Sequence, residues 1–189
     1  MTSKIAAALL CALTFAVAAR ATQAPSAPPP PPLTPVAALD VKRYMGDWYE
    51  IAKFPNWFQR NCAGDTRASY TLRPDGGVVV DNRCRRANGE IDSALGAARQ
   101  LGPADSPRLE VRFAPAWLSF IPLVWADYWV IDIDDAYQLV AVSEPRRKYL
   151  WILSRTPQVD PQAYAALKAR LSARGFDLGQ LEPTPQSIR

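Results

Sequence analysis

The stretch Gly46-Asp47-Trp48-Tyr49-Glu50-Ile51-Ala52-Lys53 places a tryptophan two residues after a glycine and continues as a run of alternating polarity. Gly46 allows a sharp turn, because a residue without a Cβ reaches backbone conformations that other residues avoid. Trp48 supplies a large apolar side chain that a strand can carry into a core. The stretch predicts a first β-strand over about 47–54. By itself, a glycine two residues before a tryptophan is a weak signal.

Seven more runs with strand character follow this stretch. Each is short, rich in Val, Ile, Tyr and Trp, and bounded by turn residues such as Pro74-Asp75-Gly76-Gly77. The predicted strands cover about 47–54, 66–73, 78–84, 91–98, 108–113, 128–134, 137–143 and 149–155. No long helix interrupts them, which predicts a sequential antiparallel meander. Closing the meander into a barrel removes its two unprotected edges.

A helix is predicted over about 161–174, after the last strand. Asp160 is the expected N-cap, and Gly175 follows the last helical residue. Tyr164, Leu167 and Leu171 form one apolar stripe that predicts packing against the barrel. The predicted fold is therefore all-β: an eight-stranded antiparallel up-and-down β-barrel with a C-terminal α-helix packed outside.

Two later motifs, taken together with the first stretch, form a more specific pattern. Asp134-Asp135-Ala136-Tyr137 lies between two predicted strands, and Tyr149-Leu150-Trp151-Ile152-Leu153-Ser154-Arg155 ends the last one. With these motifs in this order, the chain resembles the lipocalins, and most of all their bacterial and apolipoprotein-D-like branch, from about residue 39 to 186. The middle motif departs from the family pattern, often Thr-Asp-Tyr, and keeps only Tyr137.

Strand parity predicts how the barrel closes. Turns alternate between the two ends of a meander, so the end of the eighth strand returns to the start of the first. Arg155 should therefore lie over Trp48, where a cation–π contact contributes about 0.5–2 kcal/mol. The family resemblance implies the same pairing. We assign Gly46, Trp48 and Arg155 to structural closure and not to catalysis.

The same parity gathers four loops, near 55–65, 85–90, 114–127 and 144–148, at one end of the barrel. Apolar side chains are frequent on two of them, and basic residues stand around them. One hypothesis is a site for an amphiphile, with Arg146, Arg147 and Lys148 binding an anionic headgroup and the loops touching a membrane surface. The alternative is a packed lid with incidental charges.

The predicted ligand cavity is the barrel interior. Alternation along the last strand places Tyr149, Trp151 and Leu153 on the same inward face as Arg155. The resemblance implies that Trp151 lines the cavity and that a tyrosine of the sixth strand, here Tyr128, joins it. Such a wall suits a small hydrophobic ligand with a polar head, such as a fatty acid or lysophospholipid.

The N-terminal residues 1–24 are expected to be a secretory signal peptide, with Lys4 before an apolar run that is shorter than the ~20 residues of a spanning helix. A short membrane anchor is the alternative. Cys11 lies inside the apolar run after a leucine, which argues against a lipid anchor there. Residues 25–38 are a proline-rich linker, and 39–189 the lipocalin domain. We expect an exported protein of the periplasm or outer membrane.

Cys62 and Cys84 remain as a pair once the signal is removed. They flank a predicted hairpin at its open end, where a disulfide is feasible in an exported protein. Two free thiols are the alternative. A zinc site is not expected, because the chain has no histidine to complete it.

The absence of histidine also excludes Ser-His-Asp and Cys-His catalysis and His-ligated haem. An enzyme acting on a lipid or isoprenoid would depend on carboxylates such as Glu50, Asp132 or Glu144. Glu50 faces inward, and we expect it to pair with an arginine or a tyrosine. Losing Lys4 and Arg20 with the signal lowers the net charge from +4 to +2, which does not favour nucleic-acid binding. No cofactor is expected, and a homodimer is left open.

Overall fold

A computed structural model describes residues 30–187 of the chain. The predicted signal peptide, Cys11 and the first linker residues, 25–29, lie outside the described residues. None of the helices within 30–187 has the length and apolar character that crossing a membrane requires.

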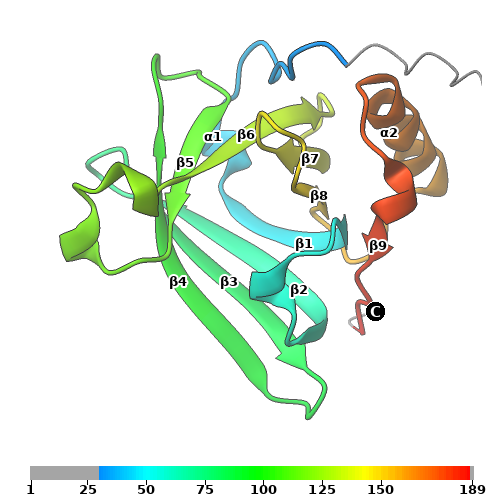
Figure 1. The fold of residues 1–189 in the computed structure, drawn as a ribbon, viewed down its shortest axis with the longest axis horizontal. Helices are drawn as coiled ribbons and strands as arrows, with labels where there is room; N and C mark the ends of the chain where they lie inside the picture. The colour runs from blue at the N-terminus through cyan, green and yellow to red at the C-terminus, as the bar shows by residue number, and fades with distance from the viewer. Residues whose placement is uncertain (1–29, 188–189) are drawn as a thin grey trace, which may run out of the picture.

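The chain forms a closed antiparallel barrel (Figure 1). Each strand pairs with the next one in the sequence, and β1 pairs with both β2 and β8. The strands are β1 (Gly46–Lys53), β2 (Cys62–Leu72), β3 (Val78–Arg86), β4 (Ile91–Gln100), β5 (Arg108–Arg112), β6 (Ala126–Ile133), β7 (Leu139–Ser143) and β8 (Leu150–Ser154). The predicted eight-stranded up-and-down barrel is confirmed. β7 begins at Leu139 instead of 137, because Tyr137 has a φ of 58°, which is not the extended conformation of a strand.

The predicted helix is α2 (Pro161–Ala173), and it lies outside the barrel wall. The side chain of Asp160 caps it by accepting from the backbone N–H of Ala163 at 2.8 Å. Leu167 and Leu171 are fully buried in a cluster with Ile131, Ile152 and other residues of the outer wall. The apolar stripe therefore attaches the helix, as predicted.

Short elements were not predicted. The helix α1 (Val41–Tyr44) precedes β1 at the closed end, and the two-residue strand β9 (Glu182–Pro183) pairs with the last residues of β1. Four 3₁₀ helices, each of three residues, lie in connecting segments: η1 (Trp57–Gln59), η2 (Ala116–Leu118), η3 (Pro122–Val124) and η4 (Leu178–Gln180). Elements this short contain less than one full period of a polarity pattern, so the sequence carries little signal for them.

The barrel wall separates two hydrophobic cores. On β8, Leu153 belongs to the inner core and Trp151 packs against it, while Leu150 and Ile152 belong to the outer core beneath α2. Alternation along the strand thus sorts side chains as predicted. The inner core contains Trp48, which is 0% exposed.

Candidate functional site

The closed end of the barrel is fixed by Arg155. Its guanidinium carbon lies 3.9 Å from the ring centroid of Trp48. Its nitrogens donate to the carbonyl oxygens of Arg43, at 2.6 Å, and Asp47, at 2.9 Å. Gly46 has a φ of +94°, and a Cβ there would lie 3.3 Å from this guanidinium. Parity therefore predicted the neighbours of Arg155 correctly, and the contacts join the beginning of β1 to the end of β8.

Three tyrosines lie above this closure, of which Tyr44 and Tyr70 are buried and Tyr128 is partly buried. The hydroxyl of Tyr128 contacts those of Tyr44, at 2.7 Å, and Tyr70, at 3.0 Å. Burial raises the pKa of all three, that of Tyr70 to about 12, so the phenols stay protonated. Two contacts use two of the three hydroxyl hydrogens, and the third has no acceptor among the described residues. Tyr128 is thus the centre of a neutral polar cluster at the inner end of the cavity.

An aromatic wall, defined as Phe58, Tyr149 and Trp151, lines the barrel towards the open end. Tyr149 and Trp151 stack with ring centroids 5.8 Å apart, and Phe58 lies 5.7 Å from Tyr149. The sequence analysis placed Tyr149 and Trp151 on one inward face but did not select Phe58, whose only signal was an apolar loop. Leu153 also faces inward but is 5% exposed, within the core below the wall.

Several side chains face the interior and are nevertheless exposed to solvent. The register places Gly96 opposite Val80 of the inner core, so Ala94 points inward as well. By the same alternation Ala126 shares a face with Tyr128. Ala94 and Ala126 are both exposed. The exposure of these inward-facing alanines shows that solvent reaches this part of the interior.

Asn82 is an additional inward residue that the sequence analysis missed. Its Cα is paired with those of Ala68 and Ala94, both small. Its Oδ1 is buried and has no hydrogen-bond partner among the described residues. An unpaired buried polar atom is costly, so it favours a ligand with a complementary group. The sequence left it unmarked, because a polar residue on a strand ordinarily faces solvent.

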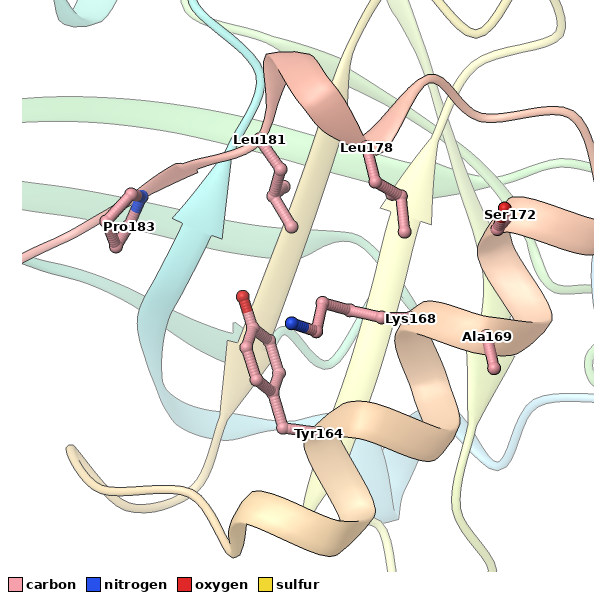
Figure 2. A pocket seen from close by; sticks show the side chains of 7 residues that line it. All are labelled: Tyr164, Lys168, Ala169, Ser172, Leu178, Leu181 and Pro183. Carbon is pink, nitrogen blue, oxygen red and sulfur yellow. The ribbon is translucent and has the colours of Figure 1, made fainter.

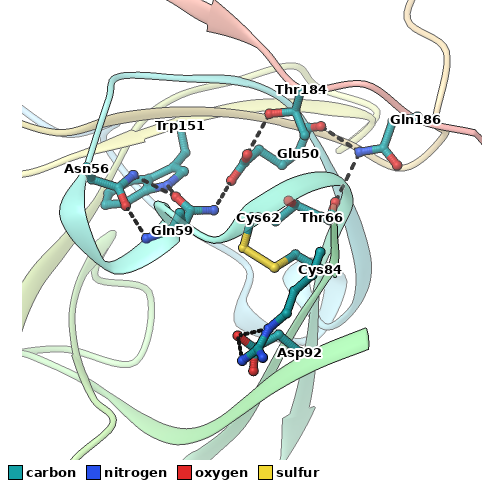
Figure 3. Close-up of a disulfide and its surroundings, with 11 residues drawn as sticks. Glu50, Asn56, Gln59, Cys62, Thr66, Cys84, Asp92, Trp151, Thr184 and Gln186 are labelled. Atoms are coloured by element: carbon teal, nitrogen blue, oxygen red, sulfur yellow. Dashed lines mark hydrogen bonds and ion pairs between the residues drawn. A yellow bond between two sulfur atoms is a disulfide. The ribbon is translucent and has the colours of Figure 1, made fainter. Parts of the chain in front are cut away.

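Glu50 is the carboxylate that an enzyme hypothesis would use first. It is 2% exposed, and its carboxylate accepts from Gln59 Nε2 at 2.7 Å and Thr184 Oγ1 at 2.6 Å (Figure 3). Burial raises its pKa. The predicted arginine or tyrosine partner is wrong, since neutral groups hold it. Gln59 in turn accepts from Trp151 Nε1 at 3.1 Å, so Glu50 supports the aromatic wall from behind.

The other two candidate carboxylates also have structural partners. Asp132 forms a two-bond ion pair with Arg170 of α2, at 2.8 Å for each contact. Glu144 accepts the backbone N–H of Arg146 at 2.8 Å. Within residues 30–187, no group of three His, Cys, Asp or Glu side chains is arranged to hold a metal ion.

The basic loop between β7 and β8 divides into two parts. The Arg146 side chain is 84% exposed, and the Lys148 ammonium lies 5.5 Å from the Tyr149 ring. Arg147 instead donates to the carbonyls of Arg174, at 2.9 Å, and Pro31, at 2.6 Å. Its placement departs from the predicted headgroup contact, because these carbonyls bind its guanidinium at the end of α2.

The apolar loops of the open end do not form a packed lid. Exposed fractions are 70% for Trp57, 71% for Trp117, 77% for Phe120 and 93% for Leu123. These side chains face water around the open end instead of covering the interior.

The predicted disulfide is confirmed. Cys62 and Cys84 are joined, with Cα atoms 5.6 Å apart (Figure 3). The bridge ties the first residue of β2 to the open-end part of β3. It therefore holds the barrel at the end that carries the exposed loops.

A separate groove of about 530 Å³ lies outside the barrel, between α2 and the C-terminal segment (Figure 2). Its lining residues are Tyr164, Lys168, Ala169, Ser172, Leu178, Leu181 and Pro183. None of the predicted ligand-binding residues takes part in it.

Comparison with known proteins agrees with this architecture. Residues 39–186 match the family model of the lipocalin-like domain. The chain belongs to the lipocalin family. Lipocalins bind small hydrophobic ligands, and the lipocalins that this chain resembles are generally non-enzymatic. The solved structure of insecticyanin from Manduca sexta, with a TM-score of 0.63 at 19% identity over 82% of this chain and 85% of that one, shows the same fold.

Three lipocalins illustrate the range of relatives. Temperature-induced lipocalin-1 of Arabidopsis thaliana is 46% identical over 80% of this chain and 82% of its own. Outer membrane lipoprotein Blc of Escherichia coli is 37% identical over 78% and 80%. Apolipoprotein D of Mus musculus is 32% identical over 78% and 77%. The family-model match, over residues 39–186, covers the barrel and its C-terminal helix.

Proposed function

We propose that this lipocalin binds one amphiphilic lipid, a fatty acid or a lysophospholipid, in the barrel interior, and stores or carries it. The observation that carries the proposal is that Ala94 and Ala126 face inward and are nevertheless exposed to solvent. A barrel filled by its own side chains would cover both. The acyl chain lies against Tyr149 and Trp151, an apolar surface with few polar atoms.

Orientation follows from where polar and charged groups lie. The interior offers neutral groups, Asn82 and the cluster around Tyr128, which suit a hydroxyl or ester oxygen. Leu153 lies below them in the core. Positive charge is available at the open end on Lys148 and on Arg146, whose side chain is 84% exposed although its Nε lies 3.6 Å from the Glu144 carboxylate. An anionic head therefore belongs at the open end, with the chain extending inward.

Carrying is favoured over catalysis by the state of the carboxylates. Glu50, Asp132 and Glu144 all have partners that hold them in place. A lipocalin-type enzyme acting on a lipid or isoprenoid would convert its ligand, whereas a carrier returns it unchanged. The chemical identity of the recovered lipid distinguishes the two.

The proposed location is the periplasm or the outer membrane. Support comes from the pattern of residues 1–24, and from the relative of Escherichia coli whose name places it in the outer membrane as a lipoprotein. Cys11 lies within the apolar run after Leu10, so we propose export without a lipid anchor at that cysteine.

The test uses the exported protein after removal of bound lipid. Oleic acid and oleoyl-lysophosphatidylethanolamine are added separately, and native mass spectrometry records the complexes. We expect one lipid per barrel. Ala94→Trp places an indole in the hollow interior and should abolish the complex, while Leu95→Trp on the outer face of the same strand should not.

Thermal unfolding of both variants is measured in parallel. Because Ala94 and Leu95 are both exposed, neither change should lower the melting temperature greatly. Binding by a stable Ala94→Trp protein at wild-type strength would overturn the interior site. Recovery of a lipid that differs chemically from the one added would contradict the carrier hypothesis and support the enzyme hypothesis.

A further inference from the structure

The segment Phe113–Trp125, which joins β5 to β6, contains no charged residue. It also carries the three most exposed large apolar side chains of the described residues: Trp117, Phe120 and Leu123. Apolar side chains exposed together mark an interaction surface, because water hydrates them poorly. We call this segment the apolar loop.

The apolar loop has a defined shape without a partner. Its 3₁₀ helices η2 and η3 pair five backbone N–H groups within the loop, those of Leu118, Ser119, Ile121, Val124 and Trp125. The indole Nε1 of Trp125 donates to the carbonyl of Ser119 at 2.9 Å. Backbone groups that are already paired can enter an apolar phase at low cost, whereas an unpaired loop cannot.

The base of the apolar loop is fixed to the barrel wall. Trp125 lies between two guanidinium groups, with Arg99 at 4.1 Å and Arg112 at 5.2 Å from its ring centroid. The tip, with Phe120 and Leu123, has no such contacts and projects from the wall.

Basic side chains lie at the same end of the barrel. Arg60 follows the exposed Trp57 on the β1–β2 loop and contacts its ring at 5.8 Å. Within the described part of the chain, neither Arg60 nor Lys148 has a carboxylate within ion-pair distance. An anionic bilayer has its acyl region beneath a layer of phosphates. Exposed apolar side chains suit the acyl region, and cations without ion-pair partners suit the phosphates.

We propose that the apolar loop docks the open end of the barrel on an anionic phospholipid bilayer. Phe120, Leu123 and Trp117 enter the bilayer surface, and Arg60 and Lys148 lie at the level of the phosphates. Docking brings the opening of the interior to the source of an amphiphile. The proposal does not require lipid binding inside the barrel, since its apolar residues lie on the outside and only Lys148 is shared with the proposed headgroup contact.

The test is vesicle flotation of the exported protein. One set of vesicles contains phosphatidylglycerol and phosphatidylethanolamine, and the other phosphatidylcholine alone. The double variant Phe120→Ser/Leu123→Ser should lose affinity for both by about tenfold or more, because two large apolar side chains leave the surface. Its matched control, Val79→Ser/Leu95→Ser, removes two exposed apolar side chains from the outer wall and should bind vesicles as the wild type does.

A second variant separates charge from apolar insertion. Arg60→Gln should weaken binding to phosphatidylglycerol vesicles by about threefold to fivefold at low salt, and leave phosphatidylcholine vesicles unaffected. Equal loss on both vesicle types would mean that Arg60 only supports Trp57, and the charge part of the proposal would fail.

Three outcomes overturn docking itself: no flotation of the wild type, wild-type flotation of Phe120→Ser/Leu123→Ser, or an equal loss in the outer-wall control. A wild-type dimer that the loop variant turns into a monomer, with no change on vesicles, would assign the surface to a second copy of the chain. Native mass spectrometry with soluble lysophospholipid keeps the two proposals apart. The loop variant should still bind it, and Ala94→Trp should still float.

Discussion

The two ends of the barrel use the same residue types in opposite ways. At the closed end, the indole of Trp48 is fully buried beneath the guanidinium of Arg155, which is bound by main-chain carbonyls. At the open end, Trp57 and Trp117 are more than two-thirds exposed, and Arg60 is near Trp57 without an ion-pair partner among the described residues. A tryptophan beside an arginine can therefore be part of the core at one end and part of the exposed surface at the other.

What differs is how many chain segments meet around the pair. At the closed end α1, β1, the β6–β7 turn and β8 converge, so the guanidinium of Arg155 meets three main-chain carbonyls and the indole of Trp48 is fully buried. At the open end Phe58 and Arg147 pack against neighbouring segments, but the loop side chains of Trp57, Trp117, Phe120 and Leu123 stay exposed. Packing between several segments makes the closed end important for stability, whereas the exposed loops of the open end are available for binding.

The largest expected effect is on stability at the closed end. Trp48→Ala should lower the free energy of unfolding by about 3–5 kcal/mol, because it leaves a large cavity in the inner core. Trp57→Ala, the same change at the open end, should stay within about 0.5 kcal/mol of the wild type. Urea denaturation followed by circular dichroism measures both. Equal losses of unfolding free energy in the two variants would contradict the proposed difference between the closed and the open end.

The disulfide is the exception at the open end, and it should carry the next largest effect. Cys62→Ser opens a link between residues separated by 22 positions, which predicts a loss of roughly 3 kcal/mol. Thermal unfolding of the variant is compared with that of reduced wild type, and the two should coincide. A melting temperature unchanged by either treatment would show that β2 and β3 hold together without the bridge.

A smaller, pH-dependent effect is expected at Glu50, between the two ends. Its pKa is raised by burial, so the folded state keeps this proton to higher pH than the unfolded chain does. The ionised form therefore costs stability in full above the raised pKa, and this cost shrinks as the pH falls through that value until it is gone below the pKa of the unfolded chain.

Glu50→Gln should remove this part of the pH dependence, because an amide can accept from Gln59 and donate to the hydroxyl of Thr184. Denaturation curves from acidic to neutral pH test it. The variant should be at least as stable as the wild type at neutral pH, and Glu90→Gln, at an exposed turn, should keep the wild-type pH profile. Marked destabilisation by Glu50→Gln at neutral pH would contradict this.

The smallest effects concern the basic loop. Arg146→Gln/Lys148→Gln should weaken binding of oleic acid by up to about 1 kcal/mol per residue at low salt and leave an uncharged monoacylglycerol unaffected. Arg147→Gln should instead lower the melting temperature, since its guanidinium holds Arg174 and Pro31. Titration calorimetry at two salt concentrations separates the cases, and a salt-independent loss in the double variant would exclude a headgroup role.

The sequence predicted the repetitive parts of this molecule well. Polarity alternation located the eight strands and the inward face of Trp151, and turn parity placed Arg155 over Trp48. These features are local or follow from counting turns. The Cys62–Cys84 bridge followed from the predicted hairpin in the same way.

The tertiary structure alone decided the partners of side chains on irregular segments. Thr184 reaches Glu50 across 134 positions of sequence, and Pro31 takes a hydrogen bond from Arg147 across 116. Neither segment has a periodicity from which its path could be read. The exposure of Leu123 is undecided in the sequence as well, because an apolar loop residue can fold inward or stay in water. Pattern fixes which face of a strand a residue occupies, whereas packing of distant segments fixes what it meets there.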